Sequence, residues 1–365
     1  MRFEKFYFER FNDAPFNLDN PRYVLSLDGV DDILTRIVEC PPYTLEIQDF
    51  KDSDLVKSLL NIDVLKIHND RLAFAVPVFI EQDLDSIKGL CMDASEEISN
   101  AMIKEKEKIE EIISRVDNGF SNQINLYHLL CGRIFDGCAF DFLEESHLIT
   151  VSNMHQSGLD YLVIMYENSD NLSAYSNKLL CSYNRLITKE GTFSSFGDSN
   201  GKRKDLYRFI RLGELNQLSD DQKRYMHFEK DELANAYNIL LEGKPIPEIY
   251  LDIFEYFGYC KEGAINVPIY DERANNIVGS LYDVVLNAIK PILVKALSNI
   301  RQTYGLLAIR HNIDILDIGN EIYHLIFGQV NEKLVEIGLV ARPMEKSGEG
   351  RYLKCYERIS NGQNH

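Results

Sequence analysis

The chain has 365 residues, a net charge of −18 and 45% hydrophobic residues, which excludes a disordered protein and leaves room for two to three domains. Its seven scattered cysteines form no C-x-x-C pair. We therefore predict reduced thiols and expect neither a disulfide framework nor a zinc site. No run of 18 apolar residues occurs, and the first residues, MRFEKFYFERFND, do not form a secretory signal. We therefore expect a cytoplasmic protein without membrane contact.

The first part of the chain predicts two helices, a hairpin and a long helix. Apolar residues at helical spacing over 29–40 predict a helix that ends before Pro41-Pro42, and a short helix follows near 55–60. Two alternating segments within 64–79 predict strands joined by a turn at His68-Asn69-Asp70. A narrow apolar seam over 84–116 predicts a long helix that packs on a similar helix.

The middle of the chain predicts a helix, a hairpin and a connector. The helix carries the sequence Tyr-His-Leu at 127–129, and the hairpin covers 147–167. Residues 169–201 are rich in Asn, Ser and Gly, a composition that indicates a connector.

The second part of the chain predicts the same order of elements. Helices are expected over 232–241 and 248–257, with a short hairpin turning at Glu262-Gly263. The long helix over 277–300 contains Pro291, which should kink or split it. A helix with a second Tyr-His-Leu, at 323–325, then leads into a hairpin over 338–357.

Three landmarks recur in the same order and predict a duplication. AVPVF at 75–79 returns as NVPIY at 266–270, YHLLCG returns as YHLIFG, and the two final hairpins share a Ser-Gly turn. We therefore predict one copy over 1–168, a connector over 169–201 and a second copy over 202–365. The repeated segments YHLLCG and YHLIFG end at Gly132 and Gly328. A close approach of two backbones would explain glycine at these positions.

The order helix, break, helix, hairpin resembles winged helix-turn-helix transcription regulators of bacteria, the broad MarR, ArsR and PadR-like group. The segments that carry the resemblance are NIDVLKIHNDRLAFAVPVF, EYFGYCKEGAINVPIY and EIGLVARPMEKSGEGRYLKCYE. It implies a mainly α protein with small β-hairpins (α+β), made of duplicated winged-helix units. It also implies double-stranded DNA as the partner, with the two long helices forming the interface of a single-chain pseudo-dimer.

Charge separates the two halves. Residues 1–180 hold 32 acidic and 16 basic residues, whereas residues 181–365 hold 25 and 23, so a contact with phosphates should lie in the second half. Basic residues gather in GKRKDLYRFIRLGE, which a solvated turn would also explain, and in the last hairpin. The candidate DNA-binding residues are Lys202, Arg203, Lys204, Arg208, Arg211, Arg342, Lys346, Arg351, Lys354 and Arg358.

Enzymatic and metal sites are not predicted. His128 and Cys131 have a spacing that could serve a metal, but in the second copy Phe327 stands in place of the cysteine, so we expect a structural role, no metal and no cofactor. No phosphate-loop, dinucleotide, zincin or serine-hydrolase motif occurs. The prediction is a cytoplasmic DNA-binding transcription regulator and not an enzyme. The alternative is an acidic winged-helix scaffold whose first half binds a basic protein.

Overall fold

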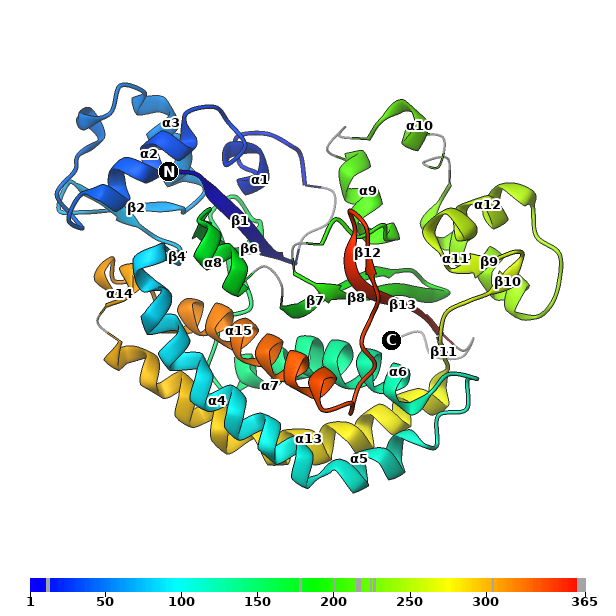
Figure 1. The fold of residues 1–365 in the computed structure, drawn as a ribbon. Helices are drawn as coiled ribbons and strands as arrows, with labels where there is room; N and C mark the ends of the chain where they lie inside the picture. Colours follow the sequence, from blue (N-terminus) through cyan, green and yellow to red (C-terminus); the bar gives the residue numbers. More distant parts are fainter. Residues whose placement is uncertain are drawn as a thin grey trace. The chain divides into compact units, whose positions relative to one another are not determined.

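The computed structural model describes residues 1–10, 14–176, 179–199, 201–214, 218–223, 225, 228–303 and 305–359 (Figure 1). The chain divides into two compact units, each built from three segments. Unit 1 contains residues 1–97, 140–177 and 290–326, and unit 2 contains residues 98–139, 178–289 and 327–365. Helices and strands occur in both, so the predicted mixed α+β class is confirmed. Each unit combines segments of both predicted copies.

Unit 1 consists of a sheet, a helix–helix–hairpin segment and several further helices. Its strands are β1 (Phe3–Glu9), β2 (Leu65–His68), β3 (Arg71–Phe74), β4 (Val78–Phe79), β5 (Asn153–Met154) and β6 (Asp160–Glu167). Its helices are α1 (Pro21–Val24), α2 (Val30–Glu39), η1 (Ile47–Asp49), α3 (Ser53–Asn61), η2 (Glu81–Asp83), α7 (Ala139–Glu145), α8 (Asp170–Ser176), η5 (Asn299–Gln302) and α14 (Leu307–Arg310). Three longer helices have parts in both units: α4 (Leu84–Lys104), α13 (Glu272–Ser298) and α15 (Ile315–Glu336).

Unit 2 has the same kinds of element. Its strands are β7 (Leu180–Ile187), β8 (Gly191–Asp198), β9 (Cys260–Lys261), β10 (Ala264–Ile265), β11 (Ile269–Tyr270), β12 (Glu345–Lys346) and β13 (Gly350–Arg358). Its helices are α5 (Lys106–Ile113), α6 (Asn122–Leu126), the π-helical segment η3 (Tyr127–Cys138), α9 (Leu206–Glu214), α10 (Asp220–Lys223), α11 (Lys230–Leu241) and α12 (Glu248–Phe257).

The predicted helix–helix–hairpin segments are present in both units. In unit 1, α2 and α3 precede the antiparallel pair β2–β3, and in unit 2, α11 and α12 precede β9–β10. Asn69 and Asp70 have positive φ at the first turn, and Glu262 and Gly263 have positive φ at the second. Asn, Asp and Gly tolerate this left-handed conformation best. The turn residues therefore explain where each hairpin reverses.

The two main sheets share strand order and register. In unit 1, β6 pairs antiparallel with β1 and parallel with β4; in unit 2, β13 pairs antiparallel with β8 and parallel with β11. Val78 pairs with Met165 and, 191 positions later in both strands, Ile269 pairs with Tyr356. Unit 2 has one strand more, because β7 pairs with β8. AVPVF and NVPIY therefore occupy equivalent places in the two sheets.

Three expectations need correction. Residues 169–201 are not a plain connector, since they contain α8 and the paired strands β7 and β8. The helix predicted over 84–116 is interrupted at Glu105, which separates α4 from α5. The helix expected to be kinked or split at Pro291 is not split, because α13 continues through this residue; a kink there stays a prediction. Burial of Ile289 and Leu293 on either side stabilises the helix despite the lost backbone hydrogen bond.

An aromatic cluster joins the helices of unit 2 to its sheet. The ring of Phe193, on β8, lies 5.2 Å from the ring of Tyr237 on α11 and 4.7 Å from that of Tyr356 on β13. Phe254 on α12 stacks on Phe193 at 6.0 Å. All four side chains are buried, and such large aromatic contacts dominate the energy of a core. The cluster fixes α12 against β13, and the candidate site lies beside this junction.

The stretch Glu272–Gln302, which includes α13, is long and apolar enough to cross a membrane by length and composition alone. Leu281, Val285, Ile289 and Leu293, however, are buried inside the protein. About 33% of its most apolar window is buried, and a single such helix is weak evidence for a membrane span. The cytoplasmic location remains a prediction.

Candidate nucleic-acid interface

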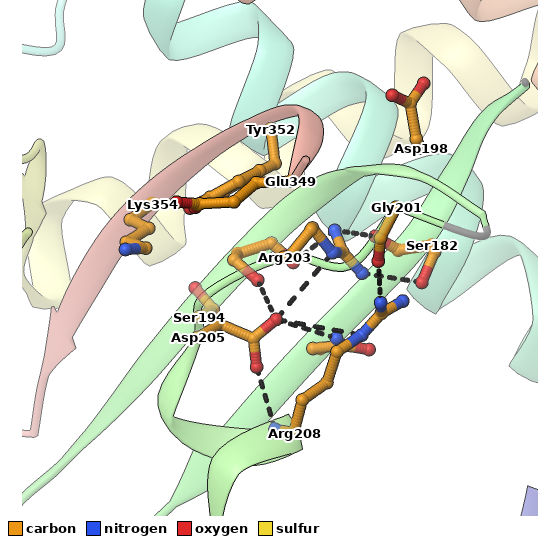
Figure 2. Close-up of polar contacts among 12 residues, drawn as sticks. Ser182, Ser194, Asp198, Gly201, Arg203, Asp205, Arg208, Glu349, Tyr352 and Lys354 are labelled. Atoms are coloured by element: carbon orange, nitrogen blue, oxygen red, sulfur yellow. Dashed lines mark hydrogen bonds and ion pairs between the residues drawn. The ribbon is translucent and has the colours of Figure 1, made fainter. Parts of the chain in front are cut away.

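The basic segment GKRKDLYRFIRLGE, residues 201–214, follows the end of β8, and its second cation, Arg203, is buried. Arg203 is 4% exposed. Its guanidinium donates to the carbonyl oxygen of Ser182 at 2.7 Å and to the hydroxyl of Ser182 at 2.6 Å, and it lies 3.7 Å from the carboxylate of Asp205 (Figure 2). A buried side chain with these partners cannot reach a phosphate. Arg203 is therefore removed from the predicted DNA-binding residues.

Asp205 organises the start of α9 and engages a second cation. Its carboxylate accepts hydrogen bonds from the backbone N–H of Arg208 at 2.8 Å and from the hydroxyl of Ser195 at 3.1 Å. A carboxylate in this position satisfies an amide at the helix N-terminus and interacts favourably with the helix dipole. The Arg208 guanidinium donates to the carbonyl oxygens of Gly201 and Ser199, and burial lowers the pKa of Arg208 to about 10. Arg208 thus closes the loop before α9.

Arg351 at the start of β13 is held by two carboxylates. Its guanidinium contacts Asp198 at 2.7 Å and Glu332 at 2.7 and 2.9 Å. Asp198 also accepts the backbone N–H of Arg351 at 2.6 Å. Planar, multiply bonded arginine–carboxylate pairs are among the strongest charged contacts in proteins. Arg351 was predicted to bind DNA, but its charge is used to join β13, β8 and α15.

Lys354 is buried in the middle of β13. Its ammonium group donates to the carbonyl oxygen of Phe257, the last residue of α12, and only 7% of the residue is exposed. A cation at a helix C-terminus satisfies a free carbonyl and complements the dipole. Its nitrogen lies 5.2 Å from the ring centre of Tyr352 and 5.6 Å from that of Tyr259. Burial, followed by repulsion from Lys346, lowers the pKa of Lys354 to about 7.

Two further lysines belong to the same cluster. Lys204 places its ammonium group 3.3 Å from the ring centre of Tyr256, and Lys346 places its own 4.9 Å from that of Tyr352. The Tyr352 hydroxyl donates to Glu349 and faces the backbone N–H of Lys204, and Figure 2 shows Tyr352, Glu349 and Lys354 together beside the basic loop. We call the five residues Lys204, Lys346, Lys354, Tyr256 and Tyr352 the lysine–tyrosine cluster. Sequence reasoning did not single out either tyrosine, although the alternation in YLKCYE puts Tyr352 and Lys354 on one face of a strand.

The other candidate cations lie at the surface. Lys202 and Arg342 are exposed, as is Lys346. Arg211 lies 5.8 Å from the ring of Tyr207, and Arg358 is paired with Glu242 at 3.0 Å. Four of the ten predicted residues are therefore engaged inside the protein, and the others can be reached by a ligand to different degrees. The four internal residues are Arg203, Arg208, Arg351 and Lys354.

Helix α12 presents an acidic surface. In a helix–helix–hairpin segment this second helix is the one expected to face DNA. Glu248, Asp252 and Glu255 are exposed on α12, and Ile249 beside them is 49% exposed. The helix sequence EIYLDIFEYF contains neither Lys nor Arg. Its surface therefore repels a phosphate backbone.

The Tyr-His-Leu segments pack inside the units. His128 is buried, and burial lowers its pKa to about 3; among the described residues no group of three or more His, Cys, Asp or Glu could hold a metal. A Cβ at Gly132 would meet the Phe196 ring at 3.3 Å, and one at Gly328 would meet Leu179 Cβ at 2.9 Å. The nearest atoms belong to side chains, and at Gly328 two of them are Cβ atoms attached directly to the backbone of Leu179 and Cys181. The close approach of two backbones stays a prediction.

Comparison of the chain with protein-family models, with curated proteins and with solved structures gave no match. The function must therefore be argued from the chain's own residues.

Proposed function

We propose that the chain is a DNA-binding transcription regulator of the winged-helix type, built as a single-chain pseudo-dimer whose DNA contacts lie in its second half. The helix–helix–hairpin segments and the equivalent register of the two main sheets support two related winged-helix units. Symmetric dimers are the usual form in which such units read near-palindromic DNA.

The composition of the two units supports the pseudo-dimer. Unit 1 takes residues 290–326 from the second predicted copy, and unit 2 takes residues 98–139 from the first. Under the repeat these two segments are equivalent, and they carry the two Tyr-His-Leu sequences. Two copies that exchange the same element are the hallmark of swapped dimers. A duplicated gene that fused two such protomers would produce this arrangement in one chain.

The observation that carries the DNA proposal is the lysine–tyrosine cluster. It gathers Lys204 and Lys346, with the buried Lys354 beside them, and two aromatic rings on a chain whose net charge is −18, and exposed Lys202 and Arg342 add two cations to the same unit. Phosphate backbones are bound by such local positive charge, since each neutralised phosphate releases counterions. A contact confined to unit 2 agrees with the charge difference between the halves.

Fluorescence anisotropy with a labelled 30-base-pair duplex tests the proposal. We expect the affinity for the duplex to fall steeply between 50 and 200 mM salt, because several phosphate contacts would each release counterions. The double variant Lys202→Ala, Arg342→Ala should reduce the salt slope by about 2, because each lost cation removes about 0.9 of a counterion. Lys57→Ala, on the exposed side of α3, is the matched control and should change nothing. Absence of binding at 50 mM salt would refute the proposal.

The acidic face of α12 favours a second candidate, a scaffold that binds a basic protein segment. Glu248, Asp252 and Glu255 would pair with Lys or Arg of the partner. Heparin chromatography near pH 7.5 separates the candidates: a DNA-binding protein is retained through its basic cluster, whereas the scaffold flows through and instead binds a lysine-rich peptide, with loss on Asp252→Lys.

A further inference from the structure

A groove lies between α4 and α13 within unit 1. Figure 1 shows these two helices, in cyan and yellow, side by side, and the groove between them holds a volume of about 350 Å³. The described residues that line it belong to 1–97 and 290–326, the ranges of unit 1. Pockets for small organic molecules begin at about 300 Å³, whereas a two-turn helix of a partner, about 10 Å wide and 11 Å long, is larger than this groove. The volume of the α4–α13 groove therefore suits a small molecule.

One face of each helix forms a wall of the groove. On α4 the lining positions are 86, 89, 90, 93, 94 and 97, and on α13 and the start of η5 they are 292, 295, 296 and 299. Residues at spacings of three and four share one helical face. Three of the facing residues, Gly89, Ala94 and Ala296, are too small to fill the space between the helices. A Cβ at Gly89 would meet no atom within 4 Å, so the wall is open at this point.

The groove has an apolar floor. Ala94 is buried, and Leu90, Ile292 and Ala296 are half-buried, so each of these three still exposes part of its apolar surface to water. A ligand with an apolar body would remove this surface from water, which favours binding.

The charged side chains on the rim leave one net negative charge. The Lys295 ammonium group donates to the Glu97 carboxylate at 2.7 Å, and this pair is neutral as a whole. Asp93 lies one helical turn before Glu97 on the same face of α4. Both carboxylates raise the pKa of Lys295, and the hydrogen bond to Glu97 is the largest cause. Within the described part of the chain no hydrogen bond or ion pair engages Asp93, so its exposed carboxylate is available to a cation.

We propose that the α4–α13 groove binds a small amphipathic amine, with the apolar body of the ligand over Leu90 and Ile292 and its ammonium group at Asp93. A primary alkylamine is charged at neutral pH, as the lysine side chain is, and its charge complements the net charge of the rim. Binding is non-covalent. The site belongs to unit 1, so it goes beyond the proposed DNA contact of unit 2 and does not depend on it.

Fluorescence anisotropy of tryptamine, titrated with the full-length protein at pH 7, tests the site. Tryptamine joins a flat apolar ring to a primary ammonium group, and because the chain contains no tryptophan the indole emission comes from the probe alone. We expect saturable binding at one site with a Kd of roughly 1 mM or tighter, as a ligand of this size can reach. Indole-3-acetate has the same ring with a carboxylate in place of the ammonium group and should bind at least about tenfold more weakly, because its charge repels Asp93.

Three variants assign the binding to the groove. Asp93→Asn removes the partner of the ammonium group and should weaken tryptamine binding about three- to fivefold, the effect of one exposed ion pair. Lys295→Met releases the Glu97 carboxylate and should strengthen binding by about the same factor. Gly89→Leu places a side chain in the open part of the wall and should weaken binding at least about tenfold. Circular dichroism confirms that each variant is folded.

Two matched controls lie outside the groove. Asp252→Asn removes an exposed carboxylate of α12, and Gly279→Leu fills another open helical glycine position, on α13; both should bind tryptamine as the wild type does. Equal losses in the controls would show a general attraction of amines to the acidic chain and would overturn the site. Absence of saturable tryptamine binding, or equal affinity for indole-3-acetate, would overturn it as well. So would a dimer in sedimentation that Gly89→Leu dissociates, because a second copy would then cover the groove. None of these results affects the DNA proposal.

Discussion

Replacing Gly328 by alanine should destabilise unit 2, although alanine is the better helix former. The new Cβ would lie 2.9 Å from Leu179 Cβ and 3.2 Å from Cys181 Cβ. These atoms are attached directly to the backbone, so rotation of a side chain cannot relieve the contact. Overpacking of this kind costs about 1–3 kcal/mol, and alanine returns about 1 kcal/mol of helix propensity. We expect a net loss of about 1 kcal/mol.

Two other helical glycines serve as controls for this variant. At Gly132 the nearest atom is Phe196 Cγ at 3.3 Å, and a small tilt of the ring makes room, so Gly132→Ala should be roughly neutral. At Gly279, exposed on α13, a Cβ meets nothing within 4 Å, so Gly279→Ala should raise the stability by about 0.5–1 kcal/mol.

Thermal unfolding followed by circular dichroism measures the series. One kcal/mol corresponds to about 2–4 °C for a unit of this size. The expected order of unfolding temperatures is Gly279→Ala highest, wild type and Gly132→Ala together, and Gly328→Ala lowest. If Gly328→Ala unfolds above the wild type, the packing argument is refuted.

Other variants test the internal charges. Arg351→Ala leaves two carboxylates without their cation and should cost about 3 kcal/mol in urea unfolding; full stability would show that the network contributes little. Burial raises the pKa of Glu321 from 4.5 to about 7, although the Tyr166 hydroxyl bonds to it at 2.7 Å. The native state then binds the extra proton between these pH values, so this group's contribution to stability falls as pH rises from 4.5 to 7. Glu321→Gln should remove that contribution, and an unchanged pH profile would contradict the assignment. His128→Gln should leave DNA affinity unaltered and change no metal content by elemental analysis; a stoichiometric metal lost with the histidine would reverse that view.

Periodicity and turn residues were enough to predict the helix–helix–hairpin segments. The helix expected over 248–257 is α12 with the same ends, and the turn expected at Glu262-Gly263 is present. These features are local, because helical spacing and positive φ depend on residues that are neighbours in the sequence. The duplicated landmarks also predicted that β4 and β11 would occupy equivalent places.

Strand β8 was not predicted because its Gly and Ser residues are typical of a loop in sequence, whereas in the structure they allow close packing. All eight residues of GTFSSFGD are buried, and a Cβ at Gly197 would lie 2.0 Å from the carbonyl oxygen of Arg351. Small residues allow β13 to approach, but in the sequence they look like a connector. One of its two partner strands, β13, lies about 160 positions away along the chain, and a pairing at this distance leaves no local signal; the other, β7, is adjacent in sequence.

The sequence predicted which basic residues contribute to the candidate site, but not which of them are buried or paired with acids. Sequence alone placed the cations of 202–211 and of the last hairpin in the second half, and both contribute to the lysine–tyrosine cluster. Whether a cation is free depends on distant carboxylates: Arg351 is paired with Asp198, which lies 153 positions earlier. Burial of Arg203 depends likewise on strands that were not predicted.

Photo-crosslinking of a bromodeoxyuridine duplex, with the crosslinked peptides identified by mass spectrometry, tests the DNA proposal most directly. We predict crosslinks to peptides from residues 201–211 and 342–358, since these contain the reachable cations and Tyr352. No crosslinks are expected to α12, whose exposed face is acidic. Crosslinks concentrated on α12 or in residues 1–168 would contradict the DNA proposal.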